Sequence, residues 1–267
     1  MQEIFQVYLS LSGVVFLYMV FWYIIGLFFR RNDVADIAWW LGFLIVAWYS
    51  LFLGKFVSHV GFLSVFLVSA WGLRLASHIF LRNIHKTEDY RYKNWRDSWW
   101  KWFFVRSFFQ IFMLQGILLL LISAPIVIVT TFPISLSIFI YLWCFLWCVW
   151  FFFEVVGDYQ LSQFRKNPLN KGKLIQSGLW SLSRHPNYFG EVLQWWALWF
   201  FTLSTPYFLV AVLGPVTITA LILFVSGIPL LEKKMLLHPD FADYQRNTPR
   251  FFPWFPKRSL FLQRKPK

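Results

Sequence analysis

Apolar residues occupy long stretches of this chain, and polar residues are gathered into the segments between them. Crossing the ~30 Å hydrocarbon core of a bilayer takes roughly 20 residues of α-helix, so apolar stretches of that length are candidate membrane spans. The chain is therefore predicted to be an all-α, polytopic integral membrane bundle. The pattern predicts about seven spans, at residues 5–29, 34–54, 57–81, 107–131, 134–157, 188–205 and 207–231.

The composition indicates the same class of protein. Hydrophobic residues make up 58% of the 267 residues and charged residues only 14%, which is outside the usual range for a soluble domain. Neither a flexible linker nor a clear internal repeat interrupts the chain, so we expect one integral domain over residues 1–267. Its expected parts are a first span at 1–31, an interfacial cytoplasmic segment at 82–106, a cytoplasmic loop at 158–187 and a cytoplasmic tail at 232–267.

The net charge of +13 is explained by membrane topology. When seven spans are threaded alternately, every basic cluster between the spans falls on one side, and Lys55 alone falls on the other. By the positive-inside rule the N-terminus is outside and the C-terminus is cytoplasmic. Nucleic acid is therefore not expected as a partner. Short loops and compact size favour the inner membrane of a bacterium, and the oligomeric state is left open.

The two cysteines add no metal site. Cys144 and Cys148 are four residues apart within the fifth predicted span, on one face of a helix. Neither a disulfide framework nor a zinc-binding spacing is present, so no metal is predicted.

Ionisable side chains inside the predicted spans or directly at their ends are costly in hydrocarbon and need an explanation. They are Asp36, Arg74, His78, Glu154, Asp158, Glu191 and Glu232. All of them fall in the cytoplasmic half of the bundle. Two interpretations stay open: buried ion pairs, such as Arg74 with Asp36 or Glu154, or a polar cavity that opens to the cytoplasm.

The strongest local signal is the segment Gly178–Glu191, which contains Arg184-His185-Pro186-Asn187-Tyr188. Pro186 suits the first turn of a helix, where its missing N–H costs nothing. A helix that starts there presents free N–H groups and the positive end of its dipole, and the preceding Arg184 and His185 add donors. We expect a site for anionic groups at this point, contacted by Asn187 and Glu191 on the following turn.

The same segment, Ser183 to Glu191, resembles the signature of the steroid 5-alpha-reductase family, particularly a broad bacterial branch of it. The resemblance covers residues 33–256. Its further matches are Asp36-Ile37-Ala38-Trp39 with Gly42-Phe43, the stretch from Arg74 to Tyr92, Asp158-Tyr159-Gln160 through Arg165, and Tyr244 to Pro253.

The resemblance implies a seven-helix reductase that binds NADPH in a cytoplasm-facing cavity and delivers hydride to a carbon–carbon double bond of a hydrophobic, steroid-like, enone or isoprenoid substrate. The glycine fingerprint of soluble dinucleotide-binding folds is absent, so side chains and helix ends are expected to bind the cofactor. The cofactor residues that it implies are Asp158, Arg165, Arg184, His185, Asn187, Tyr188, Glu191, Tyr244 and Arg250. Arg74 and Glu154 are candidates for contacting the substrate.

The proton donor departs from the family pattern. Well-studied steroid reductases pair a membrane acid with a tyrosine on the third span, and Ile79 stands where that tyrosine would fall. Asp36 is the candidate acid. His78, Tyr90 and Tyr92 are candidate donors, because a general acid needs only a suitable pKa and hydrogen-bond reach; we select Asp36, His78 and Tyr92 as the catalytic set.

Two other functions are weighed. Arg-His-Pro-x-Tyr-x-Gly also occurs in S-adenosylmethionine-dependent membrane methyltransferases of lipid or prenylated substrates, which usually carry two adjacent glutamates near the last helix. This chain has only Glu232, followed by Lys233-Lys234, which favours the reductase. A non-enzymatic transport or lipid-binding protein is the third possibility. Transporters commonly contain inverted repeats with midplane sites, and no repeat is evident in this sequence.

Overall fold

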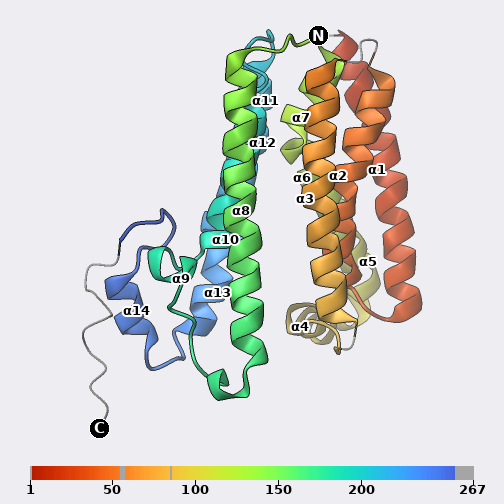
Figure 1. Cartoon of the computed structure of the whole chain (residues 1–267). Coiled ribbons are helices and arrows are strands. Elements are labelled where there is room, and N and C mark those ends of the chain that lie inside the picture. Colours follow the sequence, from red (N-terminus) through yellow and green to blue (C-terminus); the bar gives the residue numbers. More distant parts are fainter. Residues whose placement is uncertain (1, 55–57, 85, 256–267) are drawn as a thin grey trace. The chain divides into compact units, whose positions relative to one another are not determined.

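The computed structural model describes residues 2–54, 58–84 and 86–255, and Figure 1 traces the chain. Within these residues the regular secondary structure is helical throughout, without a strand, which confirms the all-α prediction. Lys55, which the topology argument places alone on one side of the membrane, lies outside the described residues. The sides on which the termini lie remain a prediction.

The α-helices follow the apolar stretches closely. They are α1 (Gln2–Phe29), α2 (Val34–Leu53), α3 (His59–Asn83), α4 (Tyr90–Trp99), α5 (Phe103–Ser107), α6 (Leu114–Ile122), α7 (Ala124–Thr131), α8 (Ile138–Lys166), α9 (Leu179–Leu182), α10 (Pro186–Phe200), α11 (Phe208–Ala211), α12 (Leu213–Ala220), α13 (Ile228–Met235) and α14 (Phe241–Asn247). π-Helical turns join α5 to α6 and follow α12, so two of the spans are composite.

Six helical runs in the described residues are long and apolar enough to cross a membrane, rather than the seven expected. The sixth predicted span, 188–205, becomes the 15-residue α10, which is shorter than the roughly 20 residues that a span requires. The helix ends because two hydroxyls beyond it bond to nearby carbonyls: Thr202 Oγ1 to Trp199 O at 2.7 Å and Thr205 Oγ1 to Thr202 O at 2.7 Å. Such side-chain hydrogen bonds compete with the backbone hydrogen bonds of a helix. Pro206, which follows Thr205 directly, does not favour continuation of the helix either.

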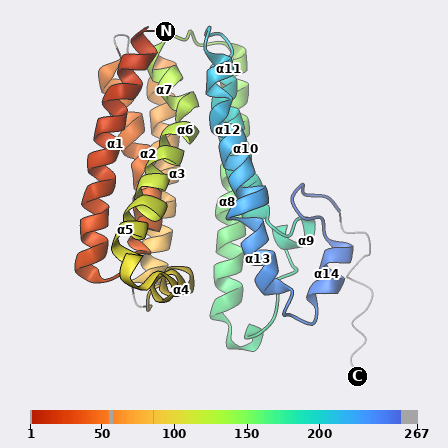
Figure 2. The ribbon, with the colours of Figure 1, turned by 180° about the vertical axis from the view of Figure 1, so that it is seen from behind.

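The chain forms two compact units, and the first comprises Met1–Ile140 and Leu198–Thr217. In this unit α2 contacts α1, α3, α6 and α7. Phe43 on α2 is fully buried, and its ring lies 5.4 Å from that of Trp71 on α3. Figure 2 shows α4 at the end of this bundle where the α1–α2 turn lies. The predicted interfacial segment 82–106 therefore contains α4 and leads without a loop into the fourth span.

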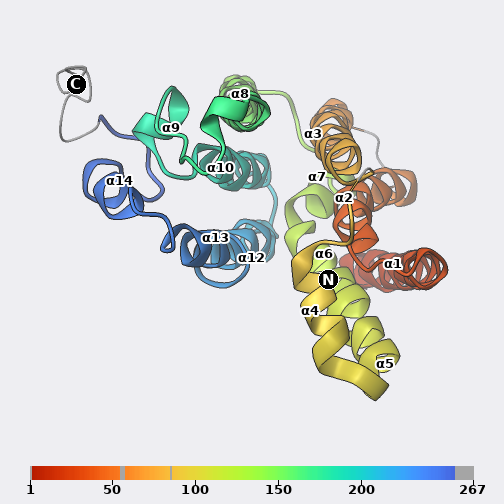
Figure 3. The same ribbon diagram turned by 90° about the horizontal axis from the view of Figure 1, so that it is seen from below.

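The second unit comprises Tyr141–Ala197 and Ile218–Lys267. Its main helices α8, α10 and α13 are seen end-on in Figure 3. α8 and α10 approach closely because glycines stand at their contact: a Cβ on Gly190 would lie 2.9 Å from the Glu154 nitrogen, and one on Gly157 3.3 Å from the Asn187 nitrogen. This close approach positions the first turn of α10. The single domain expected over residues 1–267 stays a prediction.

The contact at Gly190 can be tested by adding one methyl group. We expect Gly190→Ala to lower the free energy of unfolding by about 1–3 kcal/mol, because α8 and α10 must separate to accept the Cβ. Gly13→Ala in α1 is the matched control, since a Cβ there meets nothing within 4 Å. Thermal unfolding in detergent measures both, and equal unfolding temperatures for the two variants would contradict this packing.

Candidate functional site

Arg184, between α9 and α10, is held by hydrogen bonds on several sides. Its Nε donates to Oε1 of Glu232 at 2.8 Å, and its Nη1 donates to the carbonyls of Thr248 at 2.8 Å and Gln245 at 3.3 Å. The Arg184 side chain is only 8% exposed and that of Glu232 14%. A charge removed from water needs a partner, and these contacts supply it. Arg184 is thereby fixed against α13 and the end of α14.

The carboxylate of Glu232, on α13, is contacted by several basic side chains. Oε1 also lies 3.2 Å from Nε2 of His185, and Oε2 lies 3.5 Å from Nε of Arg250. Three of the residues that the resemblance implies for the cofactor, Arg184, His185 and Arg250, thus meet at one carboxylate. Glu232 itself is not in that implied set. Nothing in the motif indicates the pairing, because 48 residues separate Glu232 from Arg184.

The segment before α10 is also joined to the segment around α14. Two backbone hydrogen bonds join them, from Arg184 N to Pro249 O at 2.9 Å and from Trp254 N to Leu182 O at 2.9 Å. Two side-chain hydroxyls also donate to backbone carbonyls, Ser183 Oγ to Phe251 O at 2.8 Å and Tyr244 Oη to Trp180 O at 2.5 Å. Burial raises the pKa of Tyr244, so its hydroxyl stays protonated and donates. The Tyr244 to Pro253 region is therefore part of the site's framework.

His185 has no exposed surface, and its ring stacks on Tyr188 with centroids 5.9 Å apart. Burial lowers the pKa of the imidazole, and the hydrogen bond to Glu232 opposes that shift. A carboxylate only accepts, so a neutral His185 must carry its proton on Nε2. Nδ1 then has no proton, and it has no hydrogen-bond partner among the described residues.

Asn187, in the first turn of α10, donates from Nδ2 to Oδ1 of Asp158 on α8 at 3.0 Å. The bond is possible because Gly157 allows the two helices to approach. It fixes the orientation of the amide, so that the amide oxygen faces away from Asp158. Asp158 and Asn187, both expected in the cofactor site, are therefore brought together.

A cavity of about 110 Å³ adjoins Asn187 within the second unit. Its polar lining comes from Arg165, Lys173, Asn187 and Tyr244, from three parts of the chain. Apolar side chains complete the wall, among them those of Leu161, Phe164, Leu174, Ile175, Trp180, Leu231 and Met235. Two cations and an oriented amide beside an apolar wall suit an anionic group attached to a less polar body.

The other implied residues of this unit lie elsewhere. Glu191 on α10 is buried, and Glu154 on α8 is buried and accepts a hydrogen bond from Nε2 of Gln194 at 2.6 Å. Neither carboxylate lines the cavity. Glu154, expected to contact the substrate, is thus held by α10 in the interior of the unit.

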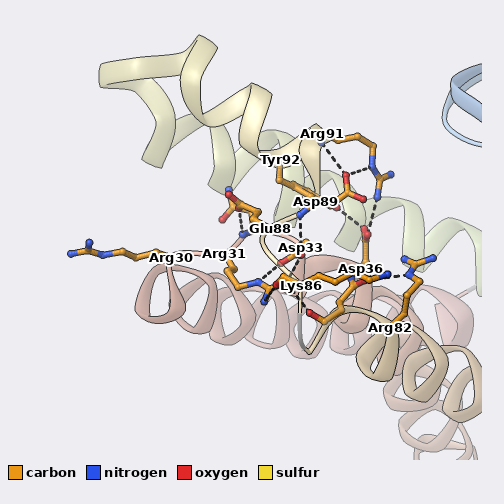
Figure 4. Close-up of polar contacts among 12 residues, drawn as sticks. Arg30, Arg31, Asp33, Asp36, Arg82, Lys86, Glu88, Asp89, Arg91 and Tyr92 are labelled. Atoms are coloured by element: carbon orange, nitrogen blue, oxygen red, sulfur yellow. Dashed lines mark hydrogen bonds and ion pairs between the residues drawn. The ribbon is translucent and has the colours of Figure 1, made fainter. Parts of the chain in front are cut away.

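In the first unit, Asp36 receives two side chains from α4, as Figure 4 shows. The hydroxyl of Tyr92 donates to Oδ1 at 2.6 Å, and Nη2 of Arg91 donates to Oδ2 at 2.9 Å. Tyr92 is 3% exposed. The predicted catalytic residues Asp36 and Tyr92, 56 positions apart in the sequence, therefore form an acid–tyrosine pair in which Tyr92 is buried and Asp36 half-buried.

A wider network surrounds this pair (Figure 4). Asp89 bonds to Arg91 at 3.0 Å, Arg31 forms an ion pair with Asp33 at 2.8 Å, and Glu88 forms one with Arg96 at 2.9 Å. The Asp89 nitrogen donates to Oδ2 of Asp33 at 3.2 Å, and the Asn32 nitrogen donates to Oε1 of Glu88 at 2.7 Å, so the network links the α1–α2 turn to the loop before α4. Arg74 and His78 are half-buried one turn apart on α3.

Comparison with known proteins gives a family. Residues 22–248 match the family described as "Protein of unknown function (DUF1295)". The chain belongs to this family. No curated protein and no solved structure matches it significantly.

One cavity residue of this DUF1295 protein is not predicted by any motif. Lys173 lies in the loop between α8 and α9, where the sequence has no periodicity. The only signal is the basic character of the loop, which also contains Lys171 and follows Lys166 at the end of α8. Nothing in that character distinguishes the lysine that lines the cavity from those that do not.

The buried His185 predicts a pH dependence of stability. Below a pH of about 6.5 the unfolded histidine binds a proton that the folded ring, with its lowered pKa, takes up only at lower pH. The DUF1295 protein should therefore lose stability as the pH falls from about 6.5 towards the pKa of the folded ring. Glu232 faces the ring and opposes the shift, whereas Arg184 and Arg250 reinforce it.

The measurement is the unfolding temperature of wild type and His185→Gln at about pH 7.5 and about pH 5.5. On acidification, the unfolding temperature of the variant should fall less than that of the wild type. Both proteins retain every other histidine, so the difference between them reports on His185. An identical loss in both proteins would show that His185 does not contribute.

Proposed function

We propose that this DUF1295 protein is a membrane-embedded reductase that uses NADPH to reduce a carbon–carbon double bond in a hydrophobic substrate. The observation that carries the proposal is the cavity that combines Arg165, Lys173 and the oriented amide of Asn187. The resemblance of residues 183–191 to the steroid 5-alpha-reductase signature supports the same activity. Substrates of the steroid-like, enone or isoprenoid class fit a protein whose described residues include six apolar helical runs long enough to span a membrane.

The donor set of the cavity suits part of the cofactor. Arg165 and Lys173 would bind phosphate oxygens through charge-assisted hydrogen bonds, and Asn187 would bind an amide edge or a hydroxyl. A volume of about 110 Å³ accommodates an anionic group and some water, but not a whole dinucleotide. When bound, NADPH supplies the hydride. The chain's own contribution at this point is to hold and orient the charged part of the cofactor.

The proposal assigns proton transfer to the pair of Tyr92 and Asp36. The single proton of the Tyr92 hydroxyl points to Oδ1 of Asp36, and Arg91 balances the carboxylate on its other oxygen. Asp36 would hold the Tyr92 hydroxyl in place, Tyr92 would turn that proton from Asp36 to the substrate and donate it, and a proton from water would restore the hydroxyl. The cofactor and proton-transfer parts of the proposal rest on separate units, and each has its own test.

The first test is a binding titration of the detergent-purified protein with NADPH, NADH and S-adenosylmethionine. We expect NADPH to bind and the methyl donor not to bind. Arg165→Gln and Lys173→Gln should each weaken NADPH binding at least about tenfold, because each removes a hydrogen bond from a charged group to phosphate. Lys171→Gln is the matched control, since Lys171 is exposed on the same loop and does not line the cavity.

Either of two results would contradict the proposed NADPH-binding site. Equal weakening by Lys171→Gln and Lys173→Gln would mean that only the loop's overall charge matters. Binding of S-adenosylmethionine without NADPH would favour the methyltransferase and would direct attention to Glu232 with Arg184 and His185.

The second test concerns the proton. With NADPH and a panel of steroid, enone and isoprenoid substrates, Tyr92→Phe should lower turnover about 10²-fold or more and leave NADPH affinity unchanged. Tyr90→Phe removes the hydroxyl of the other candidate tyrosine, which is 43% exposed, and should retain turnover. Loss of turnover in Tyr90→Phe with retention in Tyr92→Phe would transfer the role to Tyr90.

A further inference from the structure

The junction between α4 and α5 concentrates tryptophan at the surface of the first unit. α4 ends at Trp99, Trp100–Trp102 form a short 3₁₀ turn, and α5 follows. Trp100 is 77% exposed and Trp102 64%. Tryptophan is enriched at the level of lipid head groups, where its apolar ring and its polar N–H are both accommodated. The junction therefore belongs at the head-group level of the bilayer.

A groove of about 520 Å³ lies at this junction. Its lining residues are Arg96, Asp97, Trp100, Lys101, Phe103 and Phe104. Arg96 is already paired with Glu88 at 2.9 Å, and its guanidinium lies 4.3 Å over the Phe103 ring. Asp97 and Lys101 are exposed, and neither forms an ion pair within the described part of the chain. Apart from the paired Arg96, the groove thus presents one acid and one base together with aromatic rings.

The backbone explains why Asp97 and Lys101 do not pair with each other. On a continuous helix an acid and a base four residues apart are neighbours and form an ion pair. Trp100 has φ 43° and ψ −115°, which interrupts the helix between them. A positive φ is unfavourable for a bulky residue, so this turn is a specific feature of the junction. Its consequence is that both charges remain available to a ligand.

We propose that this groove binds the head group of a zwitterionic phospholipid that carries a primary ammonium, as in phosphatidylethanolamine. Lys101 binds the phosphate, and Asp97 accepts hydrogen bonds from the ammonium. Trp100 and Phe104 contact the glycerol and the first part of the acyl chains. An anionic head group would meet Asp97 without compensation, and a choline head group has no N–H to donate to it. The inference does not depend on the proposed reductase activity.

The experiment is a lipid titration of the full chain in detergent, followed by native mass spectrometry. The probes are phosphatidylethanolamine, phosphatidylcholine and phosphatidylglycerol with identical acyl chains. We expect phosphatidylethanolamine to bind best. Lys101→Gln should weaken binding of all three lipids about fivefold, which is the effect of one lysine near lipid phosphate. Asp97→Asn should abolish the preference for ethanolamine over choline, expected to be about twofold to fivefold for an exposed ion pair.

Matched controls make each outcome decisive. Lys93→Gln removes the same charge from an exposed position on α4 outside the groove, and it should leave binding unchanged. Lys101→Arg keeps the charge and should retain binding, and unfolding temperatures establish that each variant is folded. Equal losses of lipid binding in Lys93→Gln and Lys101→Gln would overturn the assignment of Lys101 as the phosphate-binding residue. A wild type without preference for ethanolamine, or an Asp97→Asn variant that keeps it, would overturn the role of Asp97.

Discussion

A carboxylate in the first turn of a membrane helix is tolerated only when other groups compensate its charge, and in the first unit that carboxylate is Asp36. The compensation comes from α4, through Arg91 at 2.9 Å and Tyr92 at 2.6 Å. Because these two residues are adjacent, they fix both the position and the rotation of the start of α4. Asp33 then accepts from the Asp89 nitrogen at 3.2 Å, and Glu88 accepts from the Asn32 nitrogen at 2.7 Å, so the neighbouring turn and loop join the same framework. The aromatic junction after α4 is positioned by this one requirement.

The same constraint organises the second unit around Glu232. Its carboxylate accepts from Arg184, and Arg184 in turn donates to carbonyls at the end of α14. A partly buried acid on α13 thereby connects the start of α10 with a segment more than 60 residues later. Asn187 follows Arg184 by three residues, so the network around Glu232 also helps to set where the amide meets Asp158 and the cavity.

The sequence predicts what depends on composition and local order, and it does not predict what depends on long-range contact. Apolar stretches placed five spans and the composite last span, because hydrocarbon imposes the same length on each of them. The early end of α10 depends on where the Thr202 and Thr205 hydroxyls donate, which hydropathy does not encode. The Asp36–Tyr92 pair joins positions 56 residues apart, and Lys173 belongs to a loop without a pattern. The sequence analysis supplied Asp36 and Tyr92 as candidates, and only tertiary structure shows that they pair and that Lys173 lines the cavity.

The Arg184 to Tyr188 motif consists of two parts with different physical roles, and this difference limits what a motif can say about function. Arg184 and His185 are bonded to Glu232 and to the end of α14, and these contacts would serve a reductase and a methyltransferase equally, because they hold the helix start in place. Asn187 instead lines the cavity beside Arg165 and Lys173. Under the proposed function, the chemistry of the ligand therefore depends on the variable position of the motif and on two residues outside it, Arg165 and Lys173. The Arg184-His185-Pro186 sequence by itself accounts for the position of the helix start and not for the choice of cofactor.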